Sequence, residues 1–161
     1  MTPAELQTLL AFLAETPDAV RRLTDELSAD AARVKPTANE FSALEQVCHL
    51  RDIEREGYGV RLRRLLAEDD PALADINGAQ LAIERNYQQQ DLAAALTDFT
   101  QARRENVARA RALTSVELAR TGTLEGVGQI NTARLLEMMR AHDEEHLAEL
   151  NALAARLSAQ A

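Results

Sequence analysis

Two histidines stand four residues apart in the C-terminal part of the chain, within the run ARLLEMMRAHDEEHLAELNALAARL. Because an α-helix turns once every 3.6 residues, His142 and His146 would lie on one face of a helix, one turn apart. Imidazoles placed in this way can bind one metal ion, and neutral imidazole is the commonest metal ligand in proteins. The spacing indicates a metal site, although two histidines packed in a core would show the same spacing.

The same pair belongs to an apolar stripe. The residues that recur there at steps of three or four are Leu135, Met139, His142, His146, Leu150, Leu153 and Leu157. This period is typical of the side of a bundle helix that faces the core. Both histidines therefore occupy positions where leucine is expected, and a polar ring at such a position calls for a specific role.

The one remaining histidine of the chain, His49, lies in the second of the expected long helices. On a helical wheel it falls roughly opposite the main apolar stripe of that helix, on the side of Ile53 and Val60. That helix must bury a second face if His49 is to reach the other two histidines, so periodicity alone does not select it as a ligand. Three imidazoles would leave coordination positions open for water or substrate, an arrangement that suits Zn, Ni, Fe or Mn.

Two better-known metal motifs are disfavoured. The metalloprotease motif H-E-x-x-H requires glutamate directly after the first histidine, where this chain has Asp143. Di-iron bundles require E-x-x-H on two helices. Glu45 precedes His49 by four residues rather than three, and neither His142 nor His146 has a glutamate three residues before it.

The composition predicts an all-α protein. The chain has 161 residues, of which 46% are hydrophobic and only 3% aromatic, with 6 glycines and 4 prolines. Such a length supports one domain with its own core, which we expect to span residues 1–161. The abundant Ala, Leu, Glu and Arg favour helices, and the few glycines and prolines disfavour a turn-rich β-sandwich.

The apolar periodicity and the capping signals predict a four-helix bundle with long connections and a short extra helix. Ser42 with Glu45 forms a capping box at the start of the second long helix, and Asp91 is the expected N-cap of the third. The first helix is expected in two pieces that meet near Pro17, where the proline marks either a kink or a true break. The expected helices span residues 3–14, 17–27, 42–67, 79–88, 91–113 and 131–157, with connections at 29–41, 69–78 and 114–130.

Charge and cysteine content limit the partners. The net charge of -8 and the pI of about 4.9 disfavour nucleic acid and anionic membrane surfaces, which would be repelled. No apolar run approaches the roughly 20 residues of a membrane span. Cys48 is the single cysteine, so no disulfide can form within the chain, and we expect a cytoplasmic protein. An aliphatic bundle of this kind often forms a homodimer, which we also expect.

Two segments resemble the DinB-like (DinB/YfiT-like) superfamily of bacterial metal-binding four-helix bundles. They are FSALEQVCHLRDIE at Phe41–Glu54 and LLEMMRAHDEEH at Leu135–His146, and the order of helices extends the resemblance to nearly the whole chain. The resemblance implies that His49, His142 and His146 bind a divalent metal, often nickel, zinc, iron or manganese. It also implies chemistry with low-molecular-weight thiols such as mycothiol or bacillithiol. The family often has tryptophan where this chain has Phe41.

We therefore expect a metal-dependent hydrolase or thiol-dependent S-transferase that acts on a small molecule through a three-histidine site between the second and fourth long helices. The alternative is a non-catalytic oligomeric bundle or stress-related binding protein, whose histidines bind a structural metal or none. Glu45, Asp52 and Asp143 are candidates to orient the ligand imidazoles through their other ring nitrogens, or are plain surface carboxylates.

Overall fold

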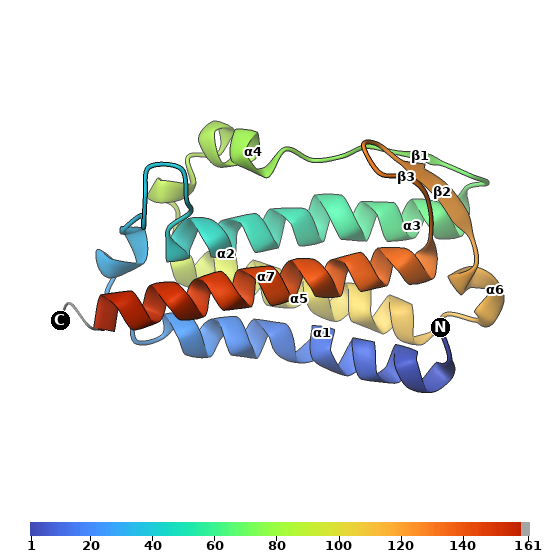
Figure 1. Ribbon diagram of the computed structural model, residues 1–161, viewed down its shortest axis with the longest axis horizontal. Helices are drawn as coiled ribbons and strands as arrows, with labels where there is room; N and C mark the ends of the chain where they lie inside the picture. Colours follow the sequence, from blue (N-terminus) through green and yellow to red (C-terminus); the bar gives the residue numbers. More distant parts are fainter. Residues whose placement is uncertain (159–161) are drawn as a thin grey trace.

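The computed structural model describes residues 1–158, and in this range four long helices pack side by side (Figure 1). They are α1 (Pro3–Thr24), a second helix composed of α2 (Ala43–Asp52), η2 (Ile53–Tyr58) and α3 (Gly59–Ala67), then α5 (Leu92–Arg111) and α7 (Thr132–Ser158). The shorter elements are η1 (Ala31–Arg33), β1 (Ala72–Leu73), α4 (Gly78–Glu84), η3 (Tyr87–Gln89), α6 (Ser115–Leu118), β2 (Thr121–Leu124) and β3 (Gly128–Asn131). None of the described helices is both long and apolar enough to cross a membrane.

The bundle has an unusual connectivity. Both α1 and the second long helix pack against α5 and against α7, so α1 lies diagonally opposite α2. Figure 1 shows that α2 and α5 run in one direction and that α1 and α7 run in the other. The neighbours α2 and α5 are therefore parallel, and the connection between them returns along the length of the bundle. The long connections that the sequence predicted thus include one that runs the length of the bundle.

Capping side chains set the helix starts that the sequence predicted. The Ser42 hydroxyl accepts a hydrogen bond from the Glu45 amide, and the Glu45 carboxylate accepts one from the Ser42 amide at 2.8 Å. The Asp91 carboxylate accepts from the Ala94 amide at 2.7 Å. Each bond satisfies a backbone N–H that has no partner inside its own helix, which fixes the starts of α2 and α5.

Pro17 was expected to mark either a kink or a true break in the first helix, and the break is absent, because α1 continues through this residue. Proline lacks the N–H that would donate to the carbonyl four residues earlier, which here is that of Leu13. The Arg103 guanidinium supplies the missing donor, since its Nη1 lies 2.9 Å from the Leu13 oxygen. A side chain from α5 thus replaces the backbone hydrogen bond, and the helix stays intact.

A π-helical turn, η2, interrupts the second long helix, which the sequence predicted as regular. An extra residue in one turn rotates everything that follows by about 100°. Nine residues of regular helix would place Tyr58 about 180° from His49. With the π turn, both rings approach His142, at centroid distances of 5.2 Å for His49 and 5.8 Å for Tyr58. The helix therefore presents His49 and Tyr58 to the same partner.

The connections predicted as loops form a small sheet at one end of the bundle (Figure 1). Strand β1 pairs with β2 in parallel, and β2 pairs with β3 antiparallel. Gly126 and Gly128 have φ values of 74° and 98°, which permit the tight turn between β2 and β3. The predicted helix over 79–88 is split into α4 and η3 by Asn86, whose φ is 49°. The long helices still make an all-α fold.

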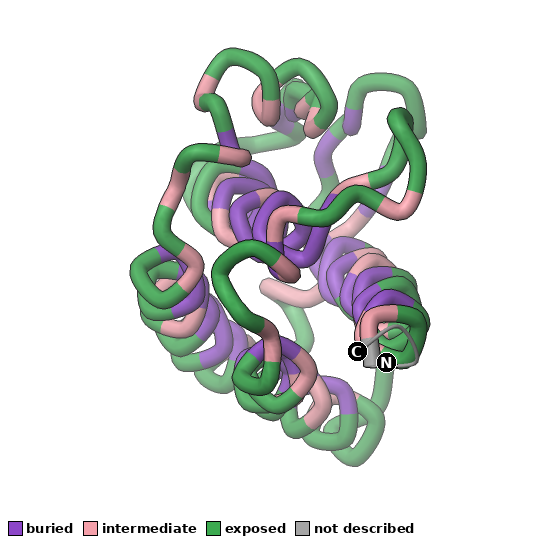
Figure 2. The backbone as a smooth tube through the Cα atoms, turned by 90° about the vertical axis from the view of Figure 1, so that its left-hand side faces the viewer, coloured by how far each residue is buried: buried purple, intermediate pink, exposed green. Residues whose placement is uncertain are grey.

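The core consists of two apolar clusters with a polar layer between them. One cluster contains Leu9, Leu13, Leu62, Leu65 and Leu135, and the other contains Val20, Leu44, Val47, Phe99 and Leu150. Figure 2 shows the buried residues on the inner sides of the helices. Along each long helix, the positions between the two clusters carry polar residues or, in α1, also a proline. These are Thr16 and Pro17, His49 and Glu54, Arg103 and Asn106, and His142, Asp143 and His146.

Candidate metal centre

The polar layer brings the three predicted histidines together. His49 comes from α2, and His142 and His146 come from successive turns of α7. One nitrogen from each ring lies within 4.8 Å of the corresponding nitrogens of the other two. The ring centroids are separated by 4.5 Å for the α7 pair and by 4.9 and 5.2 Å between that pair and His49.

The arrangement fits a shared divalent ion. Metal–nitrogen bonds of about 2.0–2.1 Å place two ligand nitrogens of one ion roughly 3 Å apart. Nε2 of His49 lies 3.1 Å from Nε2 of His142. Nδ1 of His49 is buried and has no hydrogen-bond partner among the described residues. The chain thus concentrates imidazole nitrogens beyond what its own hydrogen bonds use, as a metal site requires.

Burial keeps the imidazoles neutral, which is the form that binds metal. It lowers the pKa of His49 to about 4 and that of His142 to about 2, and the neighbouring histidines lower both further. Burial also lowers the pKa of His146, although the nearby carboxylates of Glu149 and Glu145 oppose the shift. At neutral pH no proton therefore competes with a cation for these nitrogens.

Gln46 orients His146, a contact that the sequence analysis missed. Its Oε1 lies 2.6 Å from Nδ1 of His146, and its Nε2 donates to the Glu149 carboxylate at 2.8 Å. Because the amide oxygen can only accept, the proton of His146 resides on Nδ1, which leaves Nε2 for a metal. The signal was present in the spacing, since Gln46 lies one turn before His49 and Glu149 one turn after His146.

The three carboxylates expected to orient imidazoles have other partners. Glu45 belongs to the helix cap and also pairs with Lys35 at 3.3 Å. Asp52 accepts from Arg51 and from the Tyr87 hydroxyl, each at 2.7 Å. Asp143 is fully buried, but it pairs with Arg103 rather than with a histidine. Asp143 directly follows His142, and neighbouring residues point to different sides of a helix, which explains why Asp143 does not contact a histidine.

Arg103 forms a buried charge cluster that the sequence analysis did not find. Its Nη2 donates to the Glu54 carboxylate at 2.8 Å and to the Asp143 carboxylate at 2.9 Å. The Asn106 amide donates to the same Glu54 carboxylate at 2.8 Å. With its bond to the Leu13 carbonyl, Arg103 connects all four long helices next to the histidines. The only sign of this cluster in the sequence was the polar stretch in the middle of the third long helix, α5.

A cavity of about 380 Å³ opens beside His146. Its lining includes Phe41, Gln46, Ala79, His146, Glu149, Leu153 and Arg156, from the start of α2, from α4 and from α7. The Phe41 ring also lies 5.4 Å from the His49 ring. The lining combines apolar side chains with a few charged and polar ones, as is typical of small-molecule sites.

Cys48 is not part of this site. Its thiol is buried, and burial raises the pKa of that thiol to about 11. A thiol in this state is a weak nucleophile at neutral pH. The Tyr58 hydroxyl is also engaged, because it donates to the Met138 carbonyl at 3.2 Å.

The family model of the DinB superfamily matches residues 13–150. The chain belongs to the DinB superfamily. This confirms the resemblance noted in the sequence. The fold also matches that of YfiT from Bacillus subtilis, with a TM-score of 0.91 and 17% sequence identity over 98% of this chain and 90% of the other. YfiT is described as a probable metal-dependent hydrolase with an unusual four-helix bundle topology. No curated protein sequence matches the chain.

Proposed function

We propose that this member of the DinB superfamily is a metal-dependent enzyme, either a hydrolase or a thiol-dependent S-transferase, that acts on a small molecule. The observation that supports this most strongly is the convergence of His49, His142 and His146 beside a cavity. The description of YfiT as a probable metal-dependent hydrolase agrees with it. The proposed metal is Ni, Zn, Fe or Mn, which imidazole ligands accept.

The three histidines would hold the ion through one nitrogen each and leave further coordination positions free. The chemistry that such a group supplies is Lewis acidity, which makes a nucleophile of water or a thiol near neutral pH. Gln46 keeps the His146 proton on Nδ1, and Glu149 fixes the amide of Gln46. Phe41 and Leu153 give the cavity an apolar lining, and the substrate would bind there next to His146.

The finer features of the proposal come from the sequence. A low-molecular-weight thiol as co-substrate follows from the family resemblance, and it fits a chain whose own thiol, Cys48, is buried and protonated. A cytoplasmic location and a homodimer are further parts of the proposal, the second supported by the aliphatic character of the helices. Light scattering on the purified protein measures the oligomeric state.

A paired activity screen tests the proposal. Untagged protein is loaded in turn with Zn²⁺, Ni²⁺, Fe²⁺ and Mn²⁺. It is then assayed for ester and amide hydrolysis and for transfer of bacillithiol, mycothiol or glutathione to an electrophile. We expect turnover with at least one metal and its loss in His142→Ala. Gln101→Ala, an exposed change on α5, serves as control. Turnover that survives removal of all three imidazoles would contradict the mechanism, and metal-free protein that stays folded and cannot be loaded would favour a non-catalytic bundle.

A further inference from the structure

Helix α4 covers the His49 side of the candidate metal centre, although no residue of α4 is itself buried. Gly78, its first residue, lies directly against the His49 imidazole. A Cβ atom at position 78 would overlap Cε1 of His49 and lie 2.5 Å from its Nδ1. The next residue, Ala79, lines the cavity that His146 also borders. The placement of α4 therefore determines both the room for the His49 ring and one wall of the cavity.

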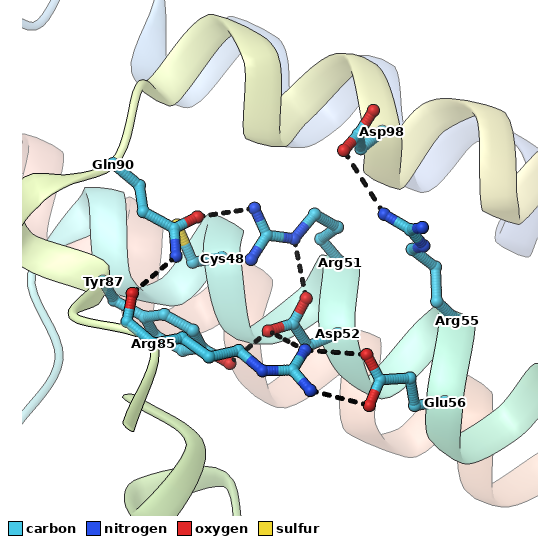
Figure 3. Close-up of polar contacts among 9 residues, drawn as sticks. All are labelled: Cys48, Arg51, Asp52, Arg55, Glu56, Arg85, Tyr87, Gln90 and Asp98. Atoms are coloured by element: carbon cyan, nitrogen blue, oxygen red, sulfur yellow. Dashed lines mark hydrogen bonds and ion pairs between the residues drawn. The ribbon is translucent and has the colours of Figure 1, made fainter. Parts of the chain in front are cut away.

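A charge cluster attaches the other end of α4 to the helix that carries His49 (Figure 3). Arg85 follows the last residue of α4, and its guanidinium pairs with Asp52 at 2.8 Å and with Glu56 at 2.7 Å. Asp52 is buried and also accepts a hydrogen bond from the Tyr87 hydroxyl at 2.7 Å. The Gln90 amide donates to the Arg85 carbonyl at 2.9 Å, so backbone and side chain are both held.

Asp52 remains an anion in this cluster. Burial alone would raise the pKa of its carboxyl group, but hydrogen bonds from Arg51 and Tyr87 and the charges of Arg51 and Arg85 lower it below the usual value. The carboxylate is thus a fixed, partly buried acceptor. Partly buried ion pairs with several hydrogen bonds constrain geometry far more than exposed pairs do.

We propose that Arg85 and Asp52 are positioning residues for the metal centre. They fix the end of α4 to α2, so that Gly78 keeps the His49 ring turned toward His142 and Ala79 completes the cavity. From the sequence, Asp52 is a candidate to orient an imidazole directly or a plain surface carboxylate, whereas in this proposal it acts through Arg85 and α4. The part of the inference that concerns metal binding rests on the proposed function, and the part that concerns α4 does not.

Arg85→Ala tests the attachment, with Arg85→Lys as the conservative variant and Arg55→Ala as the matched control. Arg55 lies on the same long helix and forms an ion pair with Asp98 of α5 at 3.3 Å, away from α4 (Figure 3). Two quantities are measured in the full-length protein. They are the hydrogen-exchange rates of amides 79–84 and the affinity for Co²⁺, which is followed by its absorption spectrum.

In Arg85→Ala we expect exchange at 79–84 to accelerate at least about 10-fold and Co²⁺ affinity to fall by about 10-fold, the usual effect of losing a group that supports a ligand. Arg85→Lys should partly restore the slow exchange at 79–84 and the Co²⁺ affinity. Arg55→Ala should change neither the exchange rates nor the affinity. Equal exchange rates at 79–84 and equal Co²⁺ affinities in Arg85→Ala and Arg55→Ala would overturn the proposal. If the unmodified protein binds no Co²⁺, the proposed function fails, and the exchange rates together with the NMR shifts of the His49 ring still decide this inference.

Gly78→Ala tests the contact with His49 independently. Alanine is favoured over glycine in helices, so global stability should not fall from the backbone change. The added methyl should displace the His49 ring and weaken Co²⁺ binding while exchange at 79–84 stays slow. Unchanged Co²⁺ affinity and an unchanged His49 ring shift in this variant would contradict the role given to Gly78.

Discussion

Two polar groups lie side by side in the layer that separates the apolar clusters, and they differ in how they are satisfied. In the Arg103 cluster, one guanidinium meets the carboxylates of Glu54 and Asp143, and only its Nε lacks a partner among the described residues. At the histidine site, like groups face one another. Nε2 of His49 and Nε2 of His142 approach to 3.1 Å, and Nδ1 of His49 has no partner in the described chain.

The difference assigns a role to each group. A buried charge that pairs with opposite charges in the same chain is already compensated. The Arg103 cluster therefore needs no external partner and acts as a structural connection between the four long helices. The three neutral imidazoles satisfy one another only through the Nε2–Nε2 contact of His49 and His142, and Nδ1 of His49 has no partner among the described residues. The three rings are kept together at a cost in desolvation, which an external cation would offset.

The strongest test of this comparison is Arg103→Met. The substitution leaves two buried carboxylates without their cation, and removal of one partner from a buried pair costs about 3–5 kcal/mol. We expect a loss of that size in the free energy of unfolding, measured by urea denaturation. Arg104→Met, at the exposed neighbouring position, is the control and should change it by less than about 0.5 kcal/mol. A loss no larger in Arg103→Met than in the control would remove the structural role of the cluster.

The metal-free protein should lose stability as the pH falls. Folding lowers the pKa of His49 to about 4 and that of His142 to about 2. In the unfolded chain these groups bind protons below about pH 6.5, so the unfolded state is favoured as the pH drops from there. We expect the free energy of unfolding to decrease by on the order of 1–3 kcal/mol between pH 7 and pH 4.

The variant His49→Gln isolates that effect, since it removes one of the titrating rings. Its free energy of unfolding should fall less steeply over the same pH range, with both proteins measured in the presence of a chelator. Identical slopes for the two proteins would show that His49 is not held neutral by the fold, and the contrast with the Arg103 cluster would then be lost.

A smaller effect is expected for Gln46→Leu. The change removes the acceptor that holds the His146 proton on Nδ1, and loss of such a partner typically weakens metal binding by about 10–100-fold. Competition titration with Zn²⁺ measures the affinity. Gln101→Leu is the control, because Gln101 is exposed and bonds only to Glu105 of its own helix at 2.7 Å. Equal affinities in the two variants would show that Gln46 does not orient the ligand.

The smallest effect is expected for Tyr58→Phe. The hydroxyl donates to the Met138 carbonyl, and loss of one such bond costs about 1 kcal/mol. The ring stays beside His142, so Zn²⁺ affinity should remain within about twofold of the unmodified protein. A much larger drop in affinity would place the hydroxyl of Tyr58 in the metal site itself.

The sequence predicted the parts of the molecule that local chemistry controls. The helix caps at Ser42 and Asp91 were found because capping depends on residues three positions apart. The pair His142 and His146 was found because it follows the helical period. His49 was on the wrong face by periodicity, and its expected role as a ligand came from the family resemblance. The π turn that aligns it with Tyr58 leaves no periodic signal in the sequence.

Contacts between distant segments account for the remaining errors. The break expected at Pro17 is absent because Arg103, from another helix, bonds the carbonyl that proline leaves free. The small sheet was missed because β1 and β2 are separated in the chain by α4, η3, α5 and α6 and are too short to show alternation. Asp52 was a candidate either to orient an imidazole or to lie at the surface, and its carboxylate pairs instead with Arg85, which is distant in the chain.

The most direct test of the central claim is the stoichiometry of Zn²⁺ binding to untagged, chelator-treated protein, measured by calorimetry beside the triple variant His49→Ala, His142→Ala, His146→Ala. The account predicts one ion per chain for the unmodified protein and none at this site for the variant, with both proteins folded. A folded unmodified protein that binds no Zn²⁺, Ni²⁺, Fe²⁺ or Mn²⁺, or a triple variant that binds as well as the unmodified protein, would contradict it.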